Sequence, residues 1–398
     1  MNYLLFDDVT WEQMLPLTFT RPVSEIRLGI LTIKEKWEKY LQATCSYVTR
    51  DYLQKKFLKE IEDDNLLINS SFIPTAELLS EIENLEMGQA LTCGEVICAL
   101  RVNREQAETF NPLSGFKGSI ISSISDCIKI NHPWDIFRMN GDGIEHDFKL
   151  ITKSRKSQML SKTNNVIGDH EIFIERGAVV EYATLNVKNG PIYIGKGAEV
   201  MENSAIRGPF TLCAHATVKM GAKIYGPTTI GPYSKVGGEL NNVVIFGYSN
   251  KAHDGFLGNS VIGEWCNLGA DTNNSNLKNN YAPVKLWNYQ SERFIDTGLQ
   301  FCGLIMGDHS KTGINTMFNT GTVVGVGANI FGDGFPRNFI PSFSWGGSHG
   351  FVECRIDTAF EIALRVMERR EIAFDEVEKK IMSQVFEMTA KYRESYHK

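Results

Sequence analysis

A six-residue repeat between residues 194 and 236 constrains the fold of this chain more than any other feature. A period of six fits neither the 3.6-residue period of an α-helix nor the alternation of an ordinary strand. It is typical of a β-helix, in which three short strands form one triangular coil and successive coils stack their apolar residues. The repeat therefore predicts a left-handed parallel β-helix. Its aliphatic positions are Ile194, Val200, Ile206, Leu212, Val218, Ile224, Ile230 and Val236.

The β-helix is expected to span residues 166–335, with one interruption. A second ladder at the same period follows further along the chain. The repeat is lost from Asn273 to about Asp296, a stretch rich in asparagine that contains Trp287 and Tyr289. A long excursion from a regular solenoid commonly serves binding. We expect this loop either to close a site or to pack on itself or on a neighbouring subunit. The second ladder consists of Met306, Thr312, Phe318, Val324 and Ile330.

Residues 1–153 are predicted to form a separate α/β domain. The segments 3–6, 66–69 and 92–102 have the apolar character of strands, and helical spacing begins at Thr32 and again at Thr75. Alternating strands and helices favour a doubly wound sheet. The polar segment 154–165 is expected to be a linker, and Asn140-Gly141-Asp142-Gly143 a turn.

The segment 352–398 is predicted to be helical. Apolar residues recur at helical spacing in 356–367 and 377–388, and Asp375 is a suitable N-cap for the second helix. The repeats are expected to end after Pro336. We expect the helices to cover the open end of the β-helix, where unpaired strand edges would otherwise favour aggregation.

Composition excludes several classes of partner. The net charge of −6 gives no support for nucleic-acid binding, and no apolar run reaches membrane-spanning length. The first residues contain acids where a signal peptide would contain basic residues. The eight cysteines lack the C-x-x-C spacing, so we expect free thiols rather than a zinc site or a disulfide framework. A cytoplasmic protein without nucleic-acid or membrane partners is the expectation.

The segment from Lys251 to Tyr281 contains the most informative polar residues. His253 is expected on the wall of the β-helix, Asn267 on the next coil, and Asn276 at the start of the interrupting loop. Histidine can accept a proton near neutral pH, and asparagine suits ligands rich in hydroxyl groups. These residues predict an acceptor pocket for acyl transfer with His253 as the base. A histidine on such a wall is more often a solvated or packing residue, and that reading stands beside the catalytic one.

The same segment resembles the acetyltransferase half of the bifunctional N-acetylglucosamine-1-phosphate uridylyltransferase / glucosamine-1-phosphate N-acetyltransferase family. The family's motif is matched by His253, Phe256, Leu257-Gly258 and Asn267-Leu268-Gly269-Ala270. The resemblance implies direct acetyl transfer from acetyl-CoA to an amino-sugar 1-phosphate, with His253 as general base. It also implies a homotrimer whose neighbouring subunits build the CoA site. It assigns Glu239, Lys251, Asn267 and Asn276 to the sugar, and Ala270, Gly313 and Gly332 to CoA.

The resemblance extends over nearly the whole chain, to a divergent, Bacteroidetes-type branch of this family, and implies a sugar nucleotidyltransferase domain at the N-terminus. The family's glycine-rich phosphate loop corresponds to Leu15–Arg21, which keeps Thr20-Arg21 without the glycines. Its metal-binding Gly-Asp corresponds to Asn69-Ser70, so the metal ligands are unknown. Mg²⁺ is implied as a cofactor if this domain is active. The candidate phosphate ligands are Arg21, Arg27, Lys34 and Lys36.

Two departures from the family pattern leave the acetyl acceptor open. The substrate tyrosine of the family is Phe256 here, and its phosphate-binding arginine aligns with Gly237. Three functions therefore stay in view. One is a bifunctional enzyme of nucleotide-sugar and cell-envelope precursor synthesis. The second is a nucleotidyltransferase whose β-helix only assembles the trimer, and the third is a non-catalytic sugar-nucleotide-binding protein.

Overall fold

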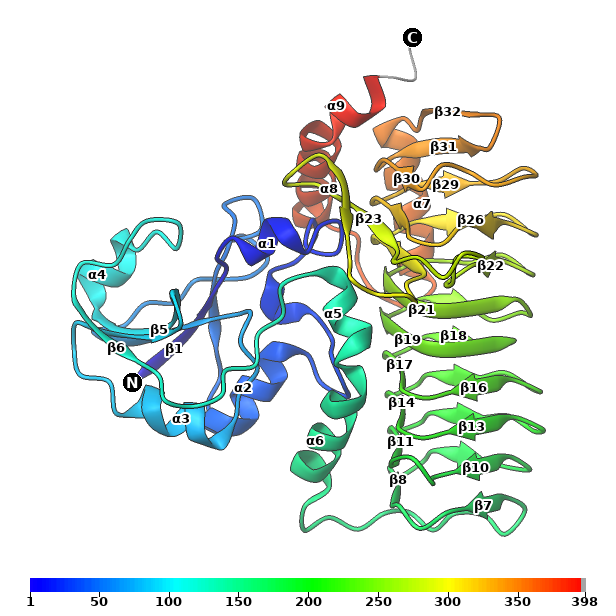
Figure 1. Ribbon diagram of the computed structural model, residues 1–398, viewed down its shortest axis with the longest axis horizontal. Coiled ribbons are helices and arrows are strands. Elements are labelled where there is room, and N and C mark those ends of the chain that lie inside the picture. The colour runs from blue at the N-terminus through cyan, green and yellow to red at the C-terminus, as the bar shows by residue number, and fades with distance from the viewer. Residues whose placement is uncertain (395–398) are drawn as a thin grey trace. The chain divides into compact units, whose positions relative to one another are not determined.

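The computed structural model describes residues 1–394, and the chain divides into two compact units (Figure 1). Unit 1 comprises Met1–Met14, Thr20–Ile26 and Leu31–His132. Unit 2 comprises Leu15–Phe19, Arg27–Ile30 and the chain from Pro133 onward. Two short segments near the N-terminus therefore belong to the unit that the C-terminal part of the chain forms. No helix within residues 1–394 has the length and apolar character needed to cross a membrane.

Unit 1 is built on a mixed sheet with the strand order β2-β1-β3-β5-β4-β6. Strand β1 lies parallel to both β2 and β3, and β5 runs antiparallel to β3. Leu4, Phe6, Leu67 and Leu100 are buried in its core. The strands are β1 (Asn2–Phe6), β2 (Ser46–Val48), β3 (Asp64–Asn69), β4 (Gln89–Cys93), β5 (Val96–Asn103) and β6 (Ser119–Ser122).

The helices of unit 1 begin where the sequence predicts. Thr32 and Glu35 form a capping box at the start of α2, and the Thr75 side chain accepts a hydrogen bond from Leu78 N at the start of α3. Both predictions are confirmed. The helices are α1 (Thr10–Gln13), the 3₁₀ helix η1 (Val23–Glu25), α2 (Ile33–Leu41), α3 (Ala76–Glu83) and α4 (Arg104–Thr109).

Two predictions for unit 1 are wrong. The single strand predicted over 92–102 is a hairpin of β4 and β5, because Gly94 adopts a φ of +62° and allows a tight turn. Cys93 and Cys127 form a disulfide, although free thiols were expected throughout. No short sequence motif marks this pair, since the two residues lie 34 positions apart.

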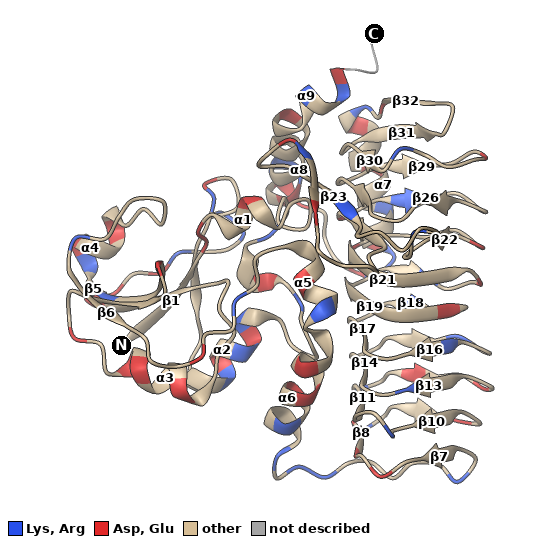
Figure 2. Cartoon of the chain, viewed as in Figure 1, with Lys and Arg blue, Asp and Glu red and all other residues tan. Residues whose placement is uncertain are grey.

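Unit 2 is a left-handed parallel β-helix with three faces, as the six-residue repeat predicts. Each strand pairs with the equivalent strand about one coil later, for example Ile206 with Ile224. Every aliphatic residue of the first ladder is buried. Basic and acidic residues are interspersed along the coils (Figure 2). The ladder side chains therefore fill the interior, and charged residues occupy the surface.

The three faces are named here face 1, face 2 and face 3 in chain order, and each corner is named by the faces it joins. Face 1 contains β7 (Asn165–Ile167), β10 (Thr184–Asn186), β13 (Ala205–Arg207), β16 (Lys223–Tyr225) and the first parts of β19 (Glu239–Gly247) and β21 (Phe256–Glu264). Face 2 contains β8 (Ile172–Ile174), β11 (Ile192–Ile194), β14 (Phe210–Leu212), β17 (Thr228–Ile230), the later parts of β19 and β21, β25 (Leu304–Met306), β28 (Thr322–Val324) and β30 (Phe339–Ile340). Face 3 contains β9 (Val179–Val180), β12 (Glu199–Val200), β15 (Thr217–Val218), β18 (Lys235–Val236), β20 (Asn250–Lys251), β26 (Lys311–Thr312), β29 (Asn329–Ile330) and β31 (Ser344–Gly347).

The repeats continue beyond Pro336, which corrects the predicted end of the β-helix. Strand β30 pairs with β28, and β31 pairs with β29. Strand β32 (Gly350–Glu353) then turns back antiparallel on β31. The repeat is lost here because the spacing changes: Ile340 pairs with Val324, 16 residues earlier, whereas Ile224 pairs with Ile206, 18 residues earlier. The antiparallel strand covers the last face-3 edge.

The interruption of the repeat is confirmed and forms a hairpin at the 1–2 corner. Strands β23 (Lys285–Asn288) and β24 (Arg293–Asp296) pair antiparallel. Trp287 stacks on Phe339 with ring centroids 4.3 Å apart, so the hairpin packs back on its own chain. The short strand β22 (Asn273–Asn274) precedes the hairpin in the sequence and β27 (Met317–Phe318) follows it. These two strands pair with each other in parallel.

The C-terminal helices are α7 (Ile356–Glu368), α8 (Glu376–Met388) and α9 (Ala390–Arg393). The Asp375 carboxylate accepts hydrogen bonds from Val377 N and Glu378 N, which confirms the predicted N-cap. Helices α7 and α8 run along the flank of the last coils rather than across their end, which corrects the expected end cover (Figure 1). Phe386 meets Phe343 edge to face, with ring centroids 5.1 Å apart. Tyr396 lies outside the described residues.

Helices α5 (Pro133–Arg138) and α6 (Asn140–Thr152) also belong to unit 2. The turn predicted at Asn140–Gly143 is wrong, because these residues form the first turn of α6. Asn140 Oδ1 accepts hydrogen bonds from Gly29 N (2.9 Å) and from Thr229 Oγ1 (3.1 Å). A Cβ atom on Gly143 would lie 2.7 Å from Leu28 Cδ2. Packing against other parts of unit 2 therefore overrides the local preference of this tetrapeptide for a turn.

Candidate active site

A cavity of about 680 Å³ lies on face 3 of the β-helix, between the coils and the end of helix α7. We call it the face-3 cavity. It brings together His253, Asn267 and Ala270, three residues to which the sequence assigns a role. The coils also contribute Lys235, Tyr248, Asn250, Trp265 and Lys311, and the helical segment contributes Val366, Arg369 and Arg370.

His253 lies in the turn between β20 and β21, at the 3–1 corner. Its side chain is exposed, and its ring makes no hydrogen bond with any of residues 1–394. Both ring nitrogens are thus available to a ligand. This is the state expected of a general base before its substrate has bound.

Lys251 fixes the turn that carries His253. It pairs in register with Val236 and so occupies an inward position of the repeat, where its side chain is 1% exposed. Its Nζ donates to the carbonyl oxygens of Gly237 (3.2 Å) and His253 (2.7 Å). Burial lowers the pKa of Lys251 to about 8, although the carboxylates of Asp254 and Asp271 act in the opposite direction. The predicted sugar ligand thus binds backbone and is not among the residues that line the cavity.

Three polar residues follow one another along face 3 beside His253. Asn250, Asn267 and Lys311 are joined by parallel bridges from one coil to the next. Asn250 Oδ1 is buried and accepts no hydrogen bond from residues 1–394. A buried carboxamide oxygen without a donor is uncommon in folded proteins, because its burial costs free energy. An N–H or hydroxyl group of a ligand could supply the missing donor.

The face-3 cavity is cationic, and Arg369 and Arg370, which directly follow α7, form what we call its cationic wall. Four of its lining residues are Lys or Arg, and none of those within residues 1–394 is Asp or Glu. Lys311 Nζ donates to His309 O (2.8 Å), and burial lowers the pKa of Lys311 to about 8. Clustered cations with hydrogen-bond donors suit phosphate groups.

The sequence did not reveal Arg369 and Arg370 as site residues. The only signal is a pair of arginines directly after the apolar stripe of α7 ends at Met367. Basic residues are common at helix C-termini because they interact favourably with the helix dipole. The pair was therefore indistinguishable from ordinary capping chemistry.

The other predicted ligands of unit 2 lie away from the face-3 cavity. Glu239 is on face 1, with its carboxylate 3.6 Å from Lys223 Nζ. Asn276 Nδ2 donates to Asn259 Oδ1 (2.8 Å) at the 1–2 corner. Gly313 and Gly332 stand at the next two 3–1 corners after Ala270. The predicted CoA residues thus follow His253 along one edge of the β-helix.

The four predicted phosphate ligands near the N-terminus are not brought together in one unit. Arg21, Lys34 and Lys36 belong to unit 1, where Arg21 and Lys36 are buried and Lys34 Nζ lies 2.6 Å from Glu38 Oε1. Arg27 belongs to unit 2. Its Nε donates to Phe246 O (3.2 Å), and its Nη1 donates to Ile30 O. Its guanidinium therefore holds a peripheral segment on the β-helix.

The residues at the carboxyl ends of β1 and β3 do not fit a resident Mg²⁺. Both Asp7 oxygens accept hydrogen bonds, from Val23 N (2.9 Å) and Thr49 Oγ1 (2.6 Å), and burial raises the pKa of this carboxyl to about 7. Asn69 Nδ2 donates to Asp8 Oδ2 (2.9 Å). Within residues 1–394 no three His, Cys, Asp or Glu side chains are grouped as a metal site. A dedicated cation site would need free carboxylate oxygens here.

Comparisons with known proteins identify relatives of both halves of the chain. Residues 3–156 match a family model described as sugar nucleotidyl transferase. The chain is 30% identical over 198 residues to the bifunctional protein GlmU of Methanocaldococcus jannaschii, an alignment that covers 50% of this chain and 43% of that protein. It is 29% identical over 382 residues to a bifunctional sugar-1-phosphate nucleotidylyltransferase/acetyltransferase of Sulfurisphaera tokodaii, covering 80% of this chain and 93% of that protein.

The solved structures that align with this chain are less similar to it in sequence than these relatives are. A UDP-N-acetylglucosamine acyltransferase from Campylobacter jejuni aligns with 60% of this chain and 85% of its own, at 15% identity and a TM-score of 0.24. The alignment to the first sequence relative spans less than half of that protein's length, whereas the alignment to the second spans nearly all of it.

Proposed function

Because this chain is a divergent relative of the bifunctional sugar-1-phosphate nucleotidylyltransferase/acetyltransferases, we propose that unit 2 transfers an acetyl group from acetyl-CoA to the amine of an amino-sugar 1-phosphate. The observation that carries this proposal is the composition of the face-3 cavity. It combines a histidine ring without a protein partner, two amides and four cations, and its lining within residues 1–394 contains no acid.

The chemistry follows from the positions of these side chains. His253 accepts a proton from the sugar amine as that amine attacks the thioester carbonyl. The tetrahedral intermediate collapses with cleavage of the C–S bond, and the proton on His253 passes to the leaving CoA thiolate. The cations hold phosphate groups, and Asn250 Oδ1 and the Asn267 carboxamide bond N–H and hydroxyl groups. Positioning both substrates together supplies a large part of the rate.

We place CoA along the 3–1 corners, where Ala270, Gly313 and Gly332 succeed one another after His253. Their small side chains leave room for an extended thiol arm beside the coils. His253 and Asn267 are exposed on a single chain, which supports a site that neighbouring copies complete in a homotrimer. Light scattering on the native protein tests this assembly. A cytoplasmic location fits the proposed co-substrate, acetyl-CoA.

The cationic wall offers a direct test of the acetyl-transfer proposal. With acetyl-CoA and glucosamine 1-phosphate, we expect Arg369→Ala/Arg370→Ala to raise KM for at least one of the two phosphorylated substrates about tenfold or more, because a charge-assisted hydrogen bond contributes roughly 1.5–3 kcal/mol. The value of kcat should change little. Release of the CoA thiol measures the reaction.

The matched control for this pair is Arg365→Ala. Arg365 also lies on α7, but it pairs with Glu361 at 2.8 Å and does not line the cavity. Its removal should leave both KM values unchanged. If the double variant behaves like this control, the wall does not bind substrate. If the wild type releases no CoA with any amino-sugar phosphate, the acetyl-transfer proposal fails.

The match of residues 3–156 to the sugar nucleotidyl transferase model supports a second activity, nucleotidyl transfer to a sugar 1-phosphate by unit 1. We expect pyrophosphate release from UTP or another nucleoside triphosphate and N-acetylglucosamine 1-phosphate in buffer containing Mg²⁺. Arg21→Ala should reduce this release about 10²-fold. Arg21 retains the positive charge that the family's phosphate loop carries at this position, and that charge stabilises the phosphates.

Arg104→Ala is the control for that assay. Arg104 is an exposed residue of unit 1 that pairs with Asp63 at 2.9 Å, so its loss should not affect turnover. Absence of pyrophosphate release with all four common nucleoside triphosphates would contradict the second activity. It would leave unit 1 as a binding module and the acetyl-transfer proposal untouched.

A further inference from the structure

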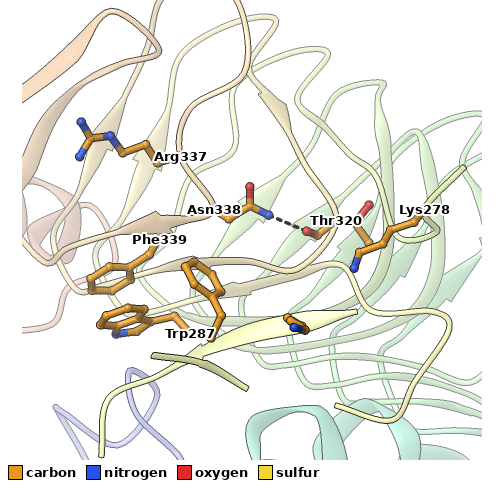
Figure 3. Close-up of a pocket in the computed structure, with 8 residues that line it drawn as sticks. Lys278, Trp287, Thr320, Arg337, Asn338 and Phe339 are labelled. Atoms are coloured by element: carbon orange, nitrogen blue, oxygen red, sulfur yellow. Dashed lines mark hydrogen bonds between the residues drawn. The ribbon is translucent and has the colours of Figure 1, made fainter. Parts of the chain in front are cut away.

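A second cavity, of about 640 Å³, lies where the β23–β24 hairpin leaves the 1–2 corner (Figure 3). We call it the hairpin cavity. Its walls come from the hairpin and from the two coils that follow it. It shares no lining residue with the face-3 cavity. Neither the proposed acetyl transfer nor the nucleotidyl transfer uses it.

Three cations face this cavity without a balancing acid. Lys278, Lys285 and Arg337 line it, and no Asp or Glu within residues 1–394 does. The side chains of Lys285 and Arg337 form no ion pair or hydrogen bond with any of residues 1–394. Lys278 Nζ donates to Pro283 O (2.7 Å), which leaves two of its three N–H groups for a ligand. Positive charge gathered around a concavity attracts and concentrates anions.

One wall of the hairpin cavity is aromatic. Trp287 stacks on Phe339, and Phe294 meets Trp287 edge to face with centroids 5.5 Å apart. The Phe294 ring is 42% exposed although it belongs to this packed cluster. In Figure 3 the rings of Trp287 and Phe339 lie side by side below Asn338. A rigid, partly open aromatic surface of this kind suits a planar ring.

Asn338 adds a fixed polar group between the cations and the rings. Its Nδ2 donates to Thr320 O (2.7 Å), which orients the carboxamide, as Figure 3 shows. Its Oδ1 accepts no hydrogen bond from residues 1–394. The oxygen is therefore free to accept an N–H or hydroxyl group from a ligand.

From this combination we propose that the hairpin cavity binds a nucleoside diphosphate group. The phosphates contact Lys278 and Lys285, and Arg337 adds positive charge on the opposite side of the cavity (Figure 3). The base lies against Phe294, and Asn338 Oδ1 accepts a hydrogen bond from the base or the ribose. A simple phosphate would make no use of the aromatic wall, and an uncharged aromatic ligand would leave the cations unsatisfied. The volume lies within the range of small-molecule sites. Nucleotide sugars and CoA both contain this chemical group.

Calorimetric titration of the full-length protein tests the proposal, with ADP, a UDP-sugar, CoA and inorganic pyrophosphate as separate probes. We expect ADP to bind more tightly than pyrophosphate, because only ADP uses the aromatic wall. Lys278→Ala/Lys285→Ala and, separately, Phe294→Ala should each weaken ADP binding about tenfold or more. Preference for the UDP-sugar or for CoA identifies which source of the group the site takes.

Arg293→Ala is the matched control, since Arg293 is an exposed cation beside Phe294 that does not line the cavity. It should bind ADP like the wild type. Arg21→Ala should also retain this binding, which separates the hairpin cavity from unit 1. Unchanged ADP affinity in both hairpin-cavity variants would overturn the proposal, as would pyrophosphate binding as tightly as ADP. Either result would leave the acetyl-transfer assay, with its own variants, unaffected.

Discussion

Replacing His253 with asparagine should lower kcat for acetyl transfer by about 10²- to 10⁴-fold, the range that a positioned general base contributes. Asparagine retains a similar size and can form hydrogen bonds, but it cannot take a proton from the attacking sugar amine. The turn itself should persist, because Lys251 Nζ binds the backbone carbonyl of residue 253 and not its side chain. The KM values should therefore change little. Thiol release from acetyl-CoA in the presence of glucosamine 1-phosphate measures the effect.

The control for this variant is His170→Asn. His170 is also an exposed histidine of the β-helix, but it lies outside the face-3 cavity. It should retain wild-type kcat. A His253→Asn enzyme with undiminished kcat would exclude this residue as the base. A parallel loss in kcat and in thermal stability would instead indicate a folding defect.

A single methyl group added at Gly231 should destabilise unit 2 by at least about 3 kcal/mol. A Cβ atom there would lie 1.9 Å from Phe246 O and 2.4 Å from Phe246 C, both backbone atoms of the next coil. Neither atom can move without disturbing the pairing of β17 with β19. The φ angle of Gly231 is outside the left-handed region, so the steric contact alone is responsible. Denaturant titration of Gly231→Ala followed by circular dichroism measures the loss.

Gly247→Ala is the matched substitution one coil later, at the same corner. The nearest atom to its added Cβ would be Pro232 O at 3.4 Å, an ordinary contact. We expect a change within about 0.5 kcal/mol, because the added methyl group would meet no atom closer than an ordinary contact. Equal unfolding midpoints for the two variants would mean that the coils can separate to admit the extra atom.

The architecture of unit 2 was predictable because its signal is local and repeated. Each aliphatic residue of the ladder contacts its equivalents one coil away, so a period in the sequence corresponds directly to a contact in space. His253, Asn267 and Ala270 were assigned from one ungapped stretch of sequence, and they lie on two consecutive coils. Neighbouring coils are close in the sequence, so their residues can form a site without contacts between distant segments of the chain.

The parts that sequence reasoning missed depend on contacts between distant segments. Arg369 and Arg370 reach the face-3 cavity only because α7 runs back along the coils, and no local pattern specifies that direction. The family resemblance assigned Lys251 to the sugar, whereas its register with Val236 turns it inward. For Asn140, packing against Gly29 and Thr229 outweighs the local turn preference.

The path of α7 also determines when the site becomes complete during synthesis. The coils that carry His253 and Asn267 leave the ribosome first, and each can stack on the coil below as it emerges. Arg369 and Arg370 follow only after the rest of the β-helix has been made. A nascent chain therefore has His253 and the amides in place while Arg369 and Arg370 are still missing. The face-3 cavity thus acquires its full set of cations only in chains whose last coils and flanking helix have already folded.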